Sequence, residues 1–207
     1  MERFYNTYVE IFGHKPGSIL EIGSRDGNDA ETLRGLSKAS SSNVFVVEPH
    51  PQSFKNIINK YPNFRAFELV VSDIPGVVDF NAIPWSYGEA EAGNSSLLRK
   101  DSAVLEKVTG VKTYGPENWM KVLAVTGKTI LKLINRPEID VVKIDVEGHT
   151  FEVLKSFEND IRLLKMLHLE VELSPIWEKQ HLFNEINPYL RFFGFEEMYY
   201  IPQYYNG

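Results

Sequence analysis

The chain contains no cysteine among its 207 residues. This absence excludes disulfide bonds, zinc sites built on thiolates and catalysis by a cysteine nucleophile. Long apolar runs are also missing, because no stretch reaches the roughly 20 residues that a membrane-spanning helix needs. Residues 1–4, Met-Glu-Arg-Phe, lack the basic and apolar regions of a secretory signal. We therefore expect a cytoplasmic protein without a membrane partner.

An excess of basic residues is absent as well. The chain has 22 Lys and Arg residues against 28 Asp and Glu residues, which gives a net charge of -6. Proteins that bind nucleic acid usually carry a basic surface, so we do not expect a nucleic-acid partner. An apolar fraction of 43% and a charged fraction of 24% are ordinary for a globular protein. The length suits a single domain, residues 1–207, with a substantial core.

Short apolar runs alternate with segments of helical spacing along most of the chain. This alternation predicts a Rossmann-like, doubly wound α/β fold with a mostly parallel sheet flanked by helices. Strands are predicted at residues 18–23, 43–48, 64–71, 120–125, 139–144, 166–173 and 195–201, the last one antiparallel or reduced. Helices are predicted at residues 3–13, 28–38, 51–61, 129–135, 149–157 and 179–193. Right-handed crossovers would bring the carboxyl ends of the strands to one edge.

The remaining segments interrupt this alternation. Residues 1–16 form a lead-in helix and its turn, and residues 77–80 are predicted to form a hairpin with the third strand. Residues 84–136 read as an insertion with lid-like character. Within it, residues 84–100 form either a functional lid or a surface loop, and residues 101–109 a helical turn.

The first strand leads into the turn Glu21-Ile22-Gly23-Ser24-Arg25-Asp26-Gly27. The N–H groups of a helix that starts here suit an anionic or polar ligand, and Gly27 would let backbone and ligand approach closely. Glu48 ends the second strand and could accept hydrogen bonds from ribose hydroxyls. Asp73 ends the third and could accept from an adenine amino group. Each acid alone could equally be a helix cap or a solvated carboxylate, but together they favour a nucleoside site.

The stretch Val142-Lys143-Ile144-Asp145-Val146-Glu147-Gly148-His149 turns abruptly from apolar to polar. A parallel strand delivers groups to its carboxyl edge in this way. Asp145 and His149 are candidates for a general base, and Glu147 for orienting either one. As alternatives, Asp145 could cap a helix, Glu147 could meet a helix dipole and His149 could lie on the surface. A metal could use all three, but three ligands from one short stretch need unusual geometry, so we expect a base without metal.

The fifth parallel strand carries polar residues at alternate positions. His168, Glu170 and Glu172 alternate with leucine and valine. A central parallel strand is normally apolar on both faces. These side chains therefore line a polar cavity, face solvent, or form hydrogen bonds within the core.

Several of these segments resemble a known family. The turn at residues 21–27, Val47-Glu48-Pro49 and Ser72-Asp73 resemble the first motifs of class I S-adenosylmethionine-dependent methyltransferases. Residues 142–149 closely resemble the signature of the FkbM family within that class, and residues 93–97 and 127–131 are similar to other segments of that family. The resemblance covers about residues 17–201.

This resemblance implies S-adenosylmethionine as the cofactor and O-methylation of a hydroxyl on a sugar or sugar-containing small molecule. It places cofactor binding at Glu21, Gly23, Ser24, Arg25, Gly27, Glu48, Pro49, Ser72, Asp73 and Asp145. It places catalysis at Asp145, Glu147 and His149, and binding of a small-molecule or glycan acceptor at Ser95 and Glu170.

Two departures from the family pattern leave the acceptor unassigned. The family often has an acid after the histidine, where this chain has Thr150, and Ile130-Leu131 lacks the acid that usually follows there. A catalytically silent module that binds a nucleoside or a partner thus remains an alternative. A nicotinamide-dependent dehydrogenase is a further alternative, which the missing third glycine disfavours. The sequence does not indicate an oligomeric state.

Overall fold

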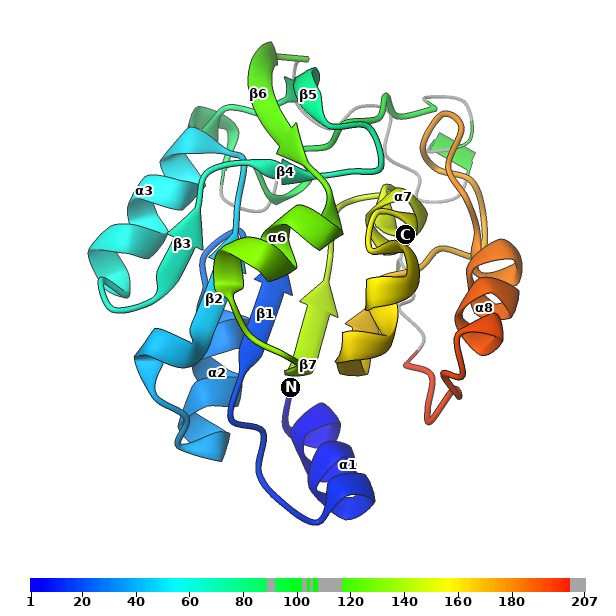
Figure 1. Ribbon diagram of the computed structural model, residues 1–207. Helices are drawn as coiled ribbons and strands as arrows, with labels where there is room; N and C mark the ends of the chain where they lie inside the picture. The colour runs from blue at the N-terminus through cyan, green and yellow to red at the C-terminus, as the bar shows by residue number, and fades with distance from the viewer. Residues whose placement is uncertain (89–91, 102–103, 105, 108–116, 202–207) are drawn as a thin grey trace.

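Five parallel strands form the main sheet of the molecule, in the order β3-β2-β1-β7-β8 (Figure 1). The computed structural model describes residues 1–88, 92–101, 104, 106–107 and 117–201. The strands are β1 (Ile19–Ile22), β2 (Val44–Val47), β3 (Arg65–Phe67), β7 (Ile139–Ile144) and β8 (Leu164–Leu169). The apolar residues of β1 and β2 are buried on both faces, as expected for central parallel strands. The predicted α/β fold is confirmed.

Helices cover both faces of this sheet, because successive side chains of a strand point to opposite sides. On one face, Ile19 and Val44 pack with α1 (Glu2–Phe12), α2 (Asn28–Ser37) and α3 (Pro51–Lys60). On the other face, Leu20 and Phe45 pack with α6 (Gly127–Ile134), α7 (Thr150–Lys155) and α8 (Phe183–Phe192). Short 3-10 helices lie at Ser41–Asn43, Trp85–Tyr87 and Glu158–Leu163. The core is therefore two apolar layers with the sheet between them.

A second, three-stranded sheet lies above the carboxyl ends of the main strands (Figure 1). It contains β4 (Val70–Val71), β6 (Trp119–Val125) and β5 (Gly76–Asn81), in that order. The predicted third strand is thus divided, since β3 joins the main sheet and β4 joins the second one. The predicted hairpin is wrong, because β5 pairs along the whole of β6. The two residues of β4 are too few to hold β5.

The carboxyl-terminal part also departs from the sequence prediction. β8 ends at Leu169 rather than at residue 173, where the chain leaves the sheet toward the carboxyl edge. α8 begins at Phe183, four residues later than predicted. Residues 195–201 contain no strand and are mostly exposed, so the predicted last strand is wrong and β8 is an edge of the sheet. The predicted helical turn at residues 101–109 falls largely outside the described residues.

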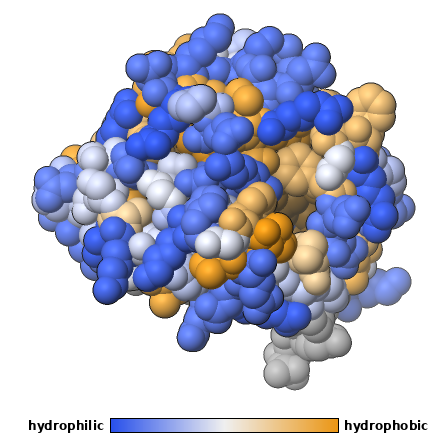
Figure 2. Space-filling model, turned by 60° about the horizontal axis from the view of Figure 1, so that its bottom comes forward, coloured by the Kyte–Doolittle hydropathy of each residue, from blue (hydrophilic) through white to orange (hydrophobic). Residues whose placement is uncertain are grey.

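The surface is mainly polar where Figure 2 shows it, with apolar residues in smaller patches between hydrophilic ones. Within the described ranges, every helix is too short or too polar to cross a membrane.

Candidate functional site

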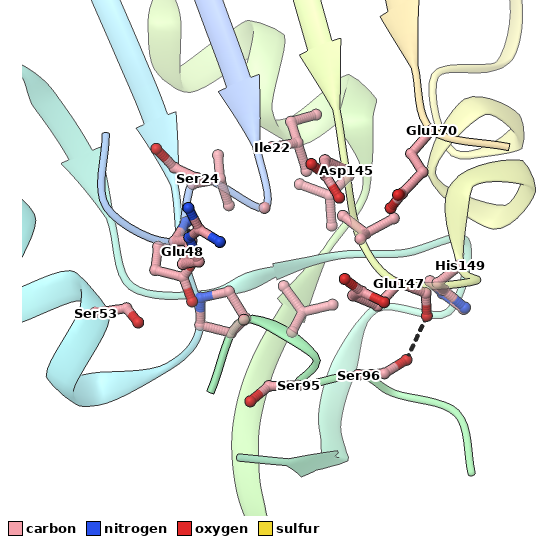
Figure 3. Close-up of a pocket in the computed structure, with 18 of the residues that line it drawn as sticks. Ile22, Ser24, Glu48, Ser53, Ser95, Ser96, Asp145, Glu147, His149 and Glu170 are labelled. Carbon is pink, nitrogen blue, oxygen red and sulfur yellow. Dashed lines mark hydrogen bonds between the residues drawn. The ribbon is translucent and has the colours of Figure 1, made fainter. Parts of the chain in front are cut away.

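A cavity of about 410 Å³ opens at the carboxyl edge of the main sheet (Figure 3). Its walls come from the ends of β1, β2 and β7, from Glu170 after β8, and from the segment 92–97. The volume lies in the range of about 300–1,000 Å³ that is common for small-molecule sites. The strand ends at which the sequence places polar and charged residues therefore meet around one cavity.

A buried carboxylate, Glu21, holds the turn after β1 by a hydrogen bond. Glu21 is 1% exposed, and its Oε2 accepts a hydrogen bond of 2.7 Å from the hydroxyl of Ser24. Burial raises the pKa of Glu21 to about 7, although Lys143 and Ser24 oppose this shift. Ser24 lines the cavity and Glu21 does not. The geometry thus supports a positioning role for Glu21 rather than direct contact with a ligand.

Gly27 occupies the N-cap of α2 with a left-handed φ of 74°. A Cβ atom there would lie 3.0 Å from the ring of Tyr61. Gly27 does not line the cavity, so its close neighbour is this ring and not the expected ligand.

Glu48 lies at the end of β2 and faces the cavity. Its Oε2 accepts a hydrogen bond of 2.7 Å from the amide of Arg25, and its Oε1 one of 2.7 Å from the amide of His50. Burial raises the pKa of Glu48 to about 7, against the effect of these two amides. Each carboxylate oxygen has a second lone pair, so Glu48 can still accept hydroxyl groups of a ligand.

Ser72 and Asp73 do not line the cavity. Asp73 forms an ion pair of 3.0 Å with Lys155 on α7, and the hydroxyl of Ser72 lies 3.1 Å from Nε2 of His149. These contacts support the packing of β4 against α7. The geometry therefore gives no support to an adenine contact by Asp73.

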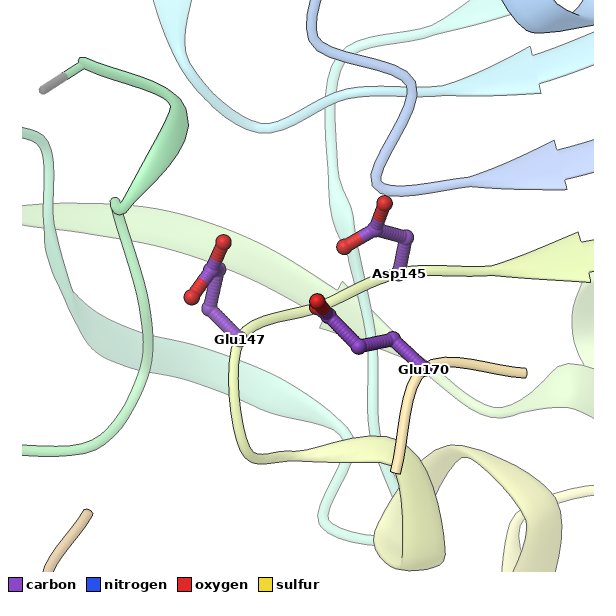
Figure 4. A group of neighbouring side chains, drawn as sticks. All are labelled: Asp145, Glu147 and Glu170. Atoms are coloured by element: carbon purple, nitrogen blue, oxygen red, sulfur yellow. The ribbon is translucent and has the colours of Figure 1, made fainter. Parts of the chain in front are cut away.

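Three carboxylates converge where β7 and β8 end at the cavity (Figure 4). Asp145 and Glu147 follow β7, Glu170 follows β8, and ligand oxygens of the three lie within 4.8 Å of one another. Burial and the charge of Asp145 raise the pKa of both glutamates. The group is compact enough to receive one cation, and it differs from the set of Asp145, Glu147 and His149 considered from the sequence.

Lys143 is a site residue that the sequence analysis missed. Its Nζ lies 2.9 Å from Asp29 Oδ2, 3.0 Å from Asp145 Oδ2 and 3.4 Å from Glu21 Oε1. Burial alone would lower its pKa, but the three carboxylates raise it well above its usual range. Burial would likewise raise the pKa of Asp145, and Lys143 brings it below its usual value. The feature of the sequence that could have identified Lys143 is its position inside an otherwise apolar strand.

His149 is 9% exposed, so the surface position considered from the sequence is excluded. Burial lowers its pKa to about 4, and it is therefore neutral near pH 7. His149 lines the cavity, with Nε2 hydrogen-bonded to Ser72 behind it, but it is too weakly basic to be a strong proton acceptor.

The segment 92–97 forms one wall of the cavity and is tied to the carboxylate turn. The hydroxyl of Ser96 donates a hydrogen bond of 2.7 Å to the carbonyl oxygen of Glu147 (Figure 3). The hydroxyl of Ser95 accepts from the amide of Ile83 and donates to the carbonyl of Ala92. Ser96, which the sequence analysis did not select, thus connects this wall to the catalytic candidates.

A sequence model described as the methyltransferase FkbM domain matches residues 21–197. The chain belongs to the FkbM methyltransferase family. This match covers all the strand ends that surround the cavity. The match favours a methyltransferase over the nicotinamide-dependent dehydrogenase that the sequence left as an alternative.

The FkbM domain is 28% identical over 154 residues to the hexuronic acid methyltransferase AglP of Haloferax volcanii. This alignment covers 74% of the chain and 55% of AglP, so the chain spans about half the length of this relative. No solved structure matches the chain significantly.

The FkbM domain places most of the predicted site residues around the cavity. Those lining it are Gly23, Ser24, Arg25, Glu48, Pro49, Ser95, Asp145, Glu147, His149 and Glu170. Those outside the lining are Glu21, Gly27, Ser72 and Asp73. Their direct roles in binding and catalysis stay predictions.

Proposed function

We propose that this FkbM domain transfers a methyl group from S-adenosylmethionine to a hydroxyl of a sugar or sugar-containing small molecule. The observation that carries the proposal is the position of Glu48 and Asp145. They follow β2 and β7, the two neighbours of β1, and face the same cavity on either side of the Gly23 turn. At one end of the cavity, Glu48 can accept hydrogen bonds from the hydroxyls of a nucleoside. At the other end, carboxylates can bind the alcohol that receives the methyl group.

The lining residues fit the cofactor. Val47, Leu69 and Phe80 provide apolar walls suited to a purine ring, and Glu48 can accept ribose hydroxyls. The bound cofactor would supply an activated methyl group on a sulfonium. The anionic Asp145 would favour positive charge beside it, because its pKa is held low by Lys143 despite burial.

The chain's own contribution is alignment and removal of a proton. Glu147 has a raised pKa, caused first by burial and then by Asp145, which suits a general base near neutral pH. Asp145 and Glu170 can hold neighbouring hydroxyls of the acceptor. The segment 92–97 forms a wall of the cavity at this end. We expect no metal requirement, since Lys143 already compensates the charge of Asp145.

The acceptor class is suggested by the relative. The name of AglP states hexuronic acid methylation, and we extend a sugar-acid acceptor to this chain as part of the proposal. Hexuronic acids offer two kinds of oxygen, hydroxyl and carboxylate. Methylation of a hydroxyl gives an ether that resists mild alkali, whereas methylation of the carboxylate gives an ester that alkali cleaves.

The test uses S-adenosylmethionine with a labelled methyl group and oligosaccharides with or without a hexuronic acid. We expect label in the sugar that survives mild alkali. Asp145→Asn should retain binding of S-adenosylhomocysteine in calorimetry and lose most of the turnover. Binding without transfer to any glycan would support the silent module instead, and release of the label as methanol would contradict hydroxyl methylation.

A further inference from the structure

Trp177 packs against the turn after β7, which carries Glu147. A Cβ atom on Gly148 would lie 2.5 Å from Cδ1 and 2.6 Å from Cγ of the indole, so the ring fills the space beside the Gly148 backbone. Trp177 is 2% exposed and does not line the cavity. The ring therefore contacts this carboxylate turn from outside the cavity.

The carboxylate turn needs support, because two successive residues in it have a left-handed backbone. The angle φ is 51° at Glu147 and 86° at Gly148. Glycine adopts this conformation freely, but glutamate does so at a cost in free energy, so contacts with the surrounding structure hold it there. The hydroxyl of Ser96 binds the carbonyl oxygen of Glu147 at 2.7 Å (Figure 3). The ring of Trp177 supports the next residue of the turn.

The backbone around Trp177 is held by a segment that is distant in the sequence. Residues 99–101 and 176–178 run antiparallel to each other. The amide of Asp101 donates a hydrogen bond of 3.1 Å to a carbonyl oxygen of the second segment, and the amide of Glu178 donates one of 2.8 Å to a carbonyl oxygen of the first. The ring is thus fixed by backbone hydrogen bonds on the side chain's own segment.

This pairing places Lys100 opposite Trp177 and over its ring. Nζ of Lys100 lies 4.7 Å from the ring centroid, within the range of a cation–π contact, and 3.2 Å from Oδ1 of Asn94. Burial lowers the pKa of Lys100, and the charge of Glu147 opposes this shift. In return, Lys100 opposes the rise that burial and Asp145 cause in the pKa of Glu147. The charge of Lys100 therefore acts on Glu147.

Stability alone does not account for a tryptophan at this position. The indole N–H of Trp177 is buried and has no hydrogen-bond partner among the residues that the structure describes. An unpaired buried donor costs free energy, and phenylalanine would avoid that cost. The indole is better explained by its contacts, because it packs against Gly148 and also lies under Lys100.

We propose that Trp177 is a positioning residue for methyl transfer, which fixes Glu147 by packing against Gly148 and holds Lys100 where its charge acts on Glu147. This inference rests on the proposed function, because it assumes that Glu147 accepts the proton of the acceptor hydroxyl. In that step the acceptor oxygen bonds to the methyl carbon as the carbon–sulfur bond breaks, and the hydroxyl proton passes to Glu147. Trp177 touches none of the reacting atoms.

The experiment measures kcat and KM for methyl transfer to a hexuronic-acid oligosaccharide, and calorimetric binding of S-adenosylhomocysteine. Trp177→Leu should lower kcat about 10- to 100-fold and leave the Kd of S-adenosylhomocysteine within about 3-fold of the wild type. Trp177→Phe should retain more turnover, because the phenyl ring still fills part of the space beside Gly148. The matched control is Trp119→Leu on β6, since Trp119 also has a cation over its ring, Arg99 at 5.1 Å, and its loss should leave kcat unchanged.

The contribution of the Lys100 charge is tested separately by the pH profile of kcat/KM. Lys100→Met should shift the rise of activity to higher pH, because Lys100 lowers the pKa of Glu147. Lys100→Arg should restore the wild-type profile, which support by packing alone would not do. The other charged groups that act on Glu147 stay in place in both variants, and they are Asp145, Glu170, Glu172 and Arg25.

The outcomes separate this inference from the proposed function. Wild-type kcat in Trp177→Leu, or an equal loss of turnover and of S-adenosylhomocysteine binding, overturns the role of Trp177 while the proposed function stands. An unchanged pH profile in Lys100→Met overturns it as well. If the melting curve shows that Trp177→Leu is unfolded, Trp177→Phe and Lys100→Met decide by the same criteria. A wild-type chain that transfers no methyl group to any oligosaccharide overturns the proposed function and this inference with it.

Discussion

The carbonyl oxygen of Asp145 lies 1.7 Å from the point that a Cβ atom on Gly23 would occupy. Gly23 also has a left-handed φ of 79°. The turn after β1 and the carboxylate turn after β7 are therefore in backbone contact. A change at Gly23 acts on both halves of the site, because the neighbouring atom is main chain and cannot rotate away.

Gly23→Ala is expected to destabilise the protein by more than about 2 kcal/mol, from the left-handed backbone together with the displaced carbonyl of Asp145. Urea unfolding measures this loss, and calorimetry measures binding of S-adenosylhomocysteine. Gly35→Ala is the matched control. A Cβ at Gly35, within α2, meets no atom within 4 Å, and alanine there should stabilise the helix slightly. Equal stability of the two variants would contradict the backbone contact.

The main sheet was predictable because its strands are short apolar runs whose type depends on local sequence. The division of the third strand was not predictable in this way. β4 leaves the main sheet because it pairs with β6, about 50 residues further along the chain. No local pattern at Val70 and Val71 encodes that partner. The same distant partner explains why β5 does not form the predicted hairpin.

The candidate site shows a similar limit. The acidic residues at the ends of β1, β2 and β4 were predictable. The direction in which each side chain points depends on residues elsewhere in the chain. Glu21 turns toward Lys143, and Asp73 turns toward Lys155. Glu170 reaches Asp145 because β7 and β8 pair in a register that sets Ile144 opposite Leu169. The alternating polar residues after residue 167 indicated an unusual strand end, but they did not predict that Glu170 would lie beside Asp145.

Ser96→Ala is expected to loosen the wall formed by residues 92–97. The variant loses the hydrogen bond of 2.7 Å to the carbonyl oxygen of Glu147, which contributes about 1 kcal/mol. We expect the KM for the acceptor to rise severalfold, while the dissociation constant of S-adenosylhomocysteine changes little. Steady-state kinetics and calorimetry provide the two values. Ser42→Ala, outside the cavity lining, serves as control, and an equal rise in both constants would argue against a specific role for this wall.

His149 makes stability depend on pH in a predictable direction. Burial lowers its pKa to about 4, below the usual 6.5, so the unfolded chain binds more protons between these values. Its contribution is complete above pH 6.5 and is lost as the pH falls toward 4. Glu21 and Glu48, whose pKa values burial raises, act in the opposite sense. The informative quantity is therefore the difference between wild type and His149→Asn.

From pH 7 to pH 5, the stability of the wild type relative to His149→Asn should fall by about 2 kcal/mol. Urea unfolding at several pH values gives this difference. His14→Asn, which changes an exposed histidine, is the matched control and is measured at the same pH values. A difference between wild type and His149→Asn that stays constant with pH would show that His149 titrates alike in both states.

Lys143 is expected to be the most costly single cation to remove within the described part of the chain. Lys143→Met leaves Glu21, Asp29 and Asp145 without their shared ammonium, and breaking a buried pair costs about 3–5 kcal/mol. The loss should be smaller at pH 5.5 than at pH 8, because the uncompensated carboxylates can then take up protons. Urea unfolding at both pH values measures it.

The matched control is Lys128→Met, which removes an exposed ion pair of 2.7 Å with Glu158 and should change stability little, since solvent screens such pairs. The double variant Lys143→Met with Glu21→Gln should recover part of the loss, because one of the three unpaired charges is then gone. Recovery would show that charge compensation, rather than the packing of the lysine stem, holds the end of β7 against the turn after β1. A loss that is independent of pH and unaffected by Glu21→Gln would assign the effect to packing instead, and would remove the reason for expecting Asp145 to stay ionised beside Glu147 and Glu170.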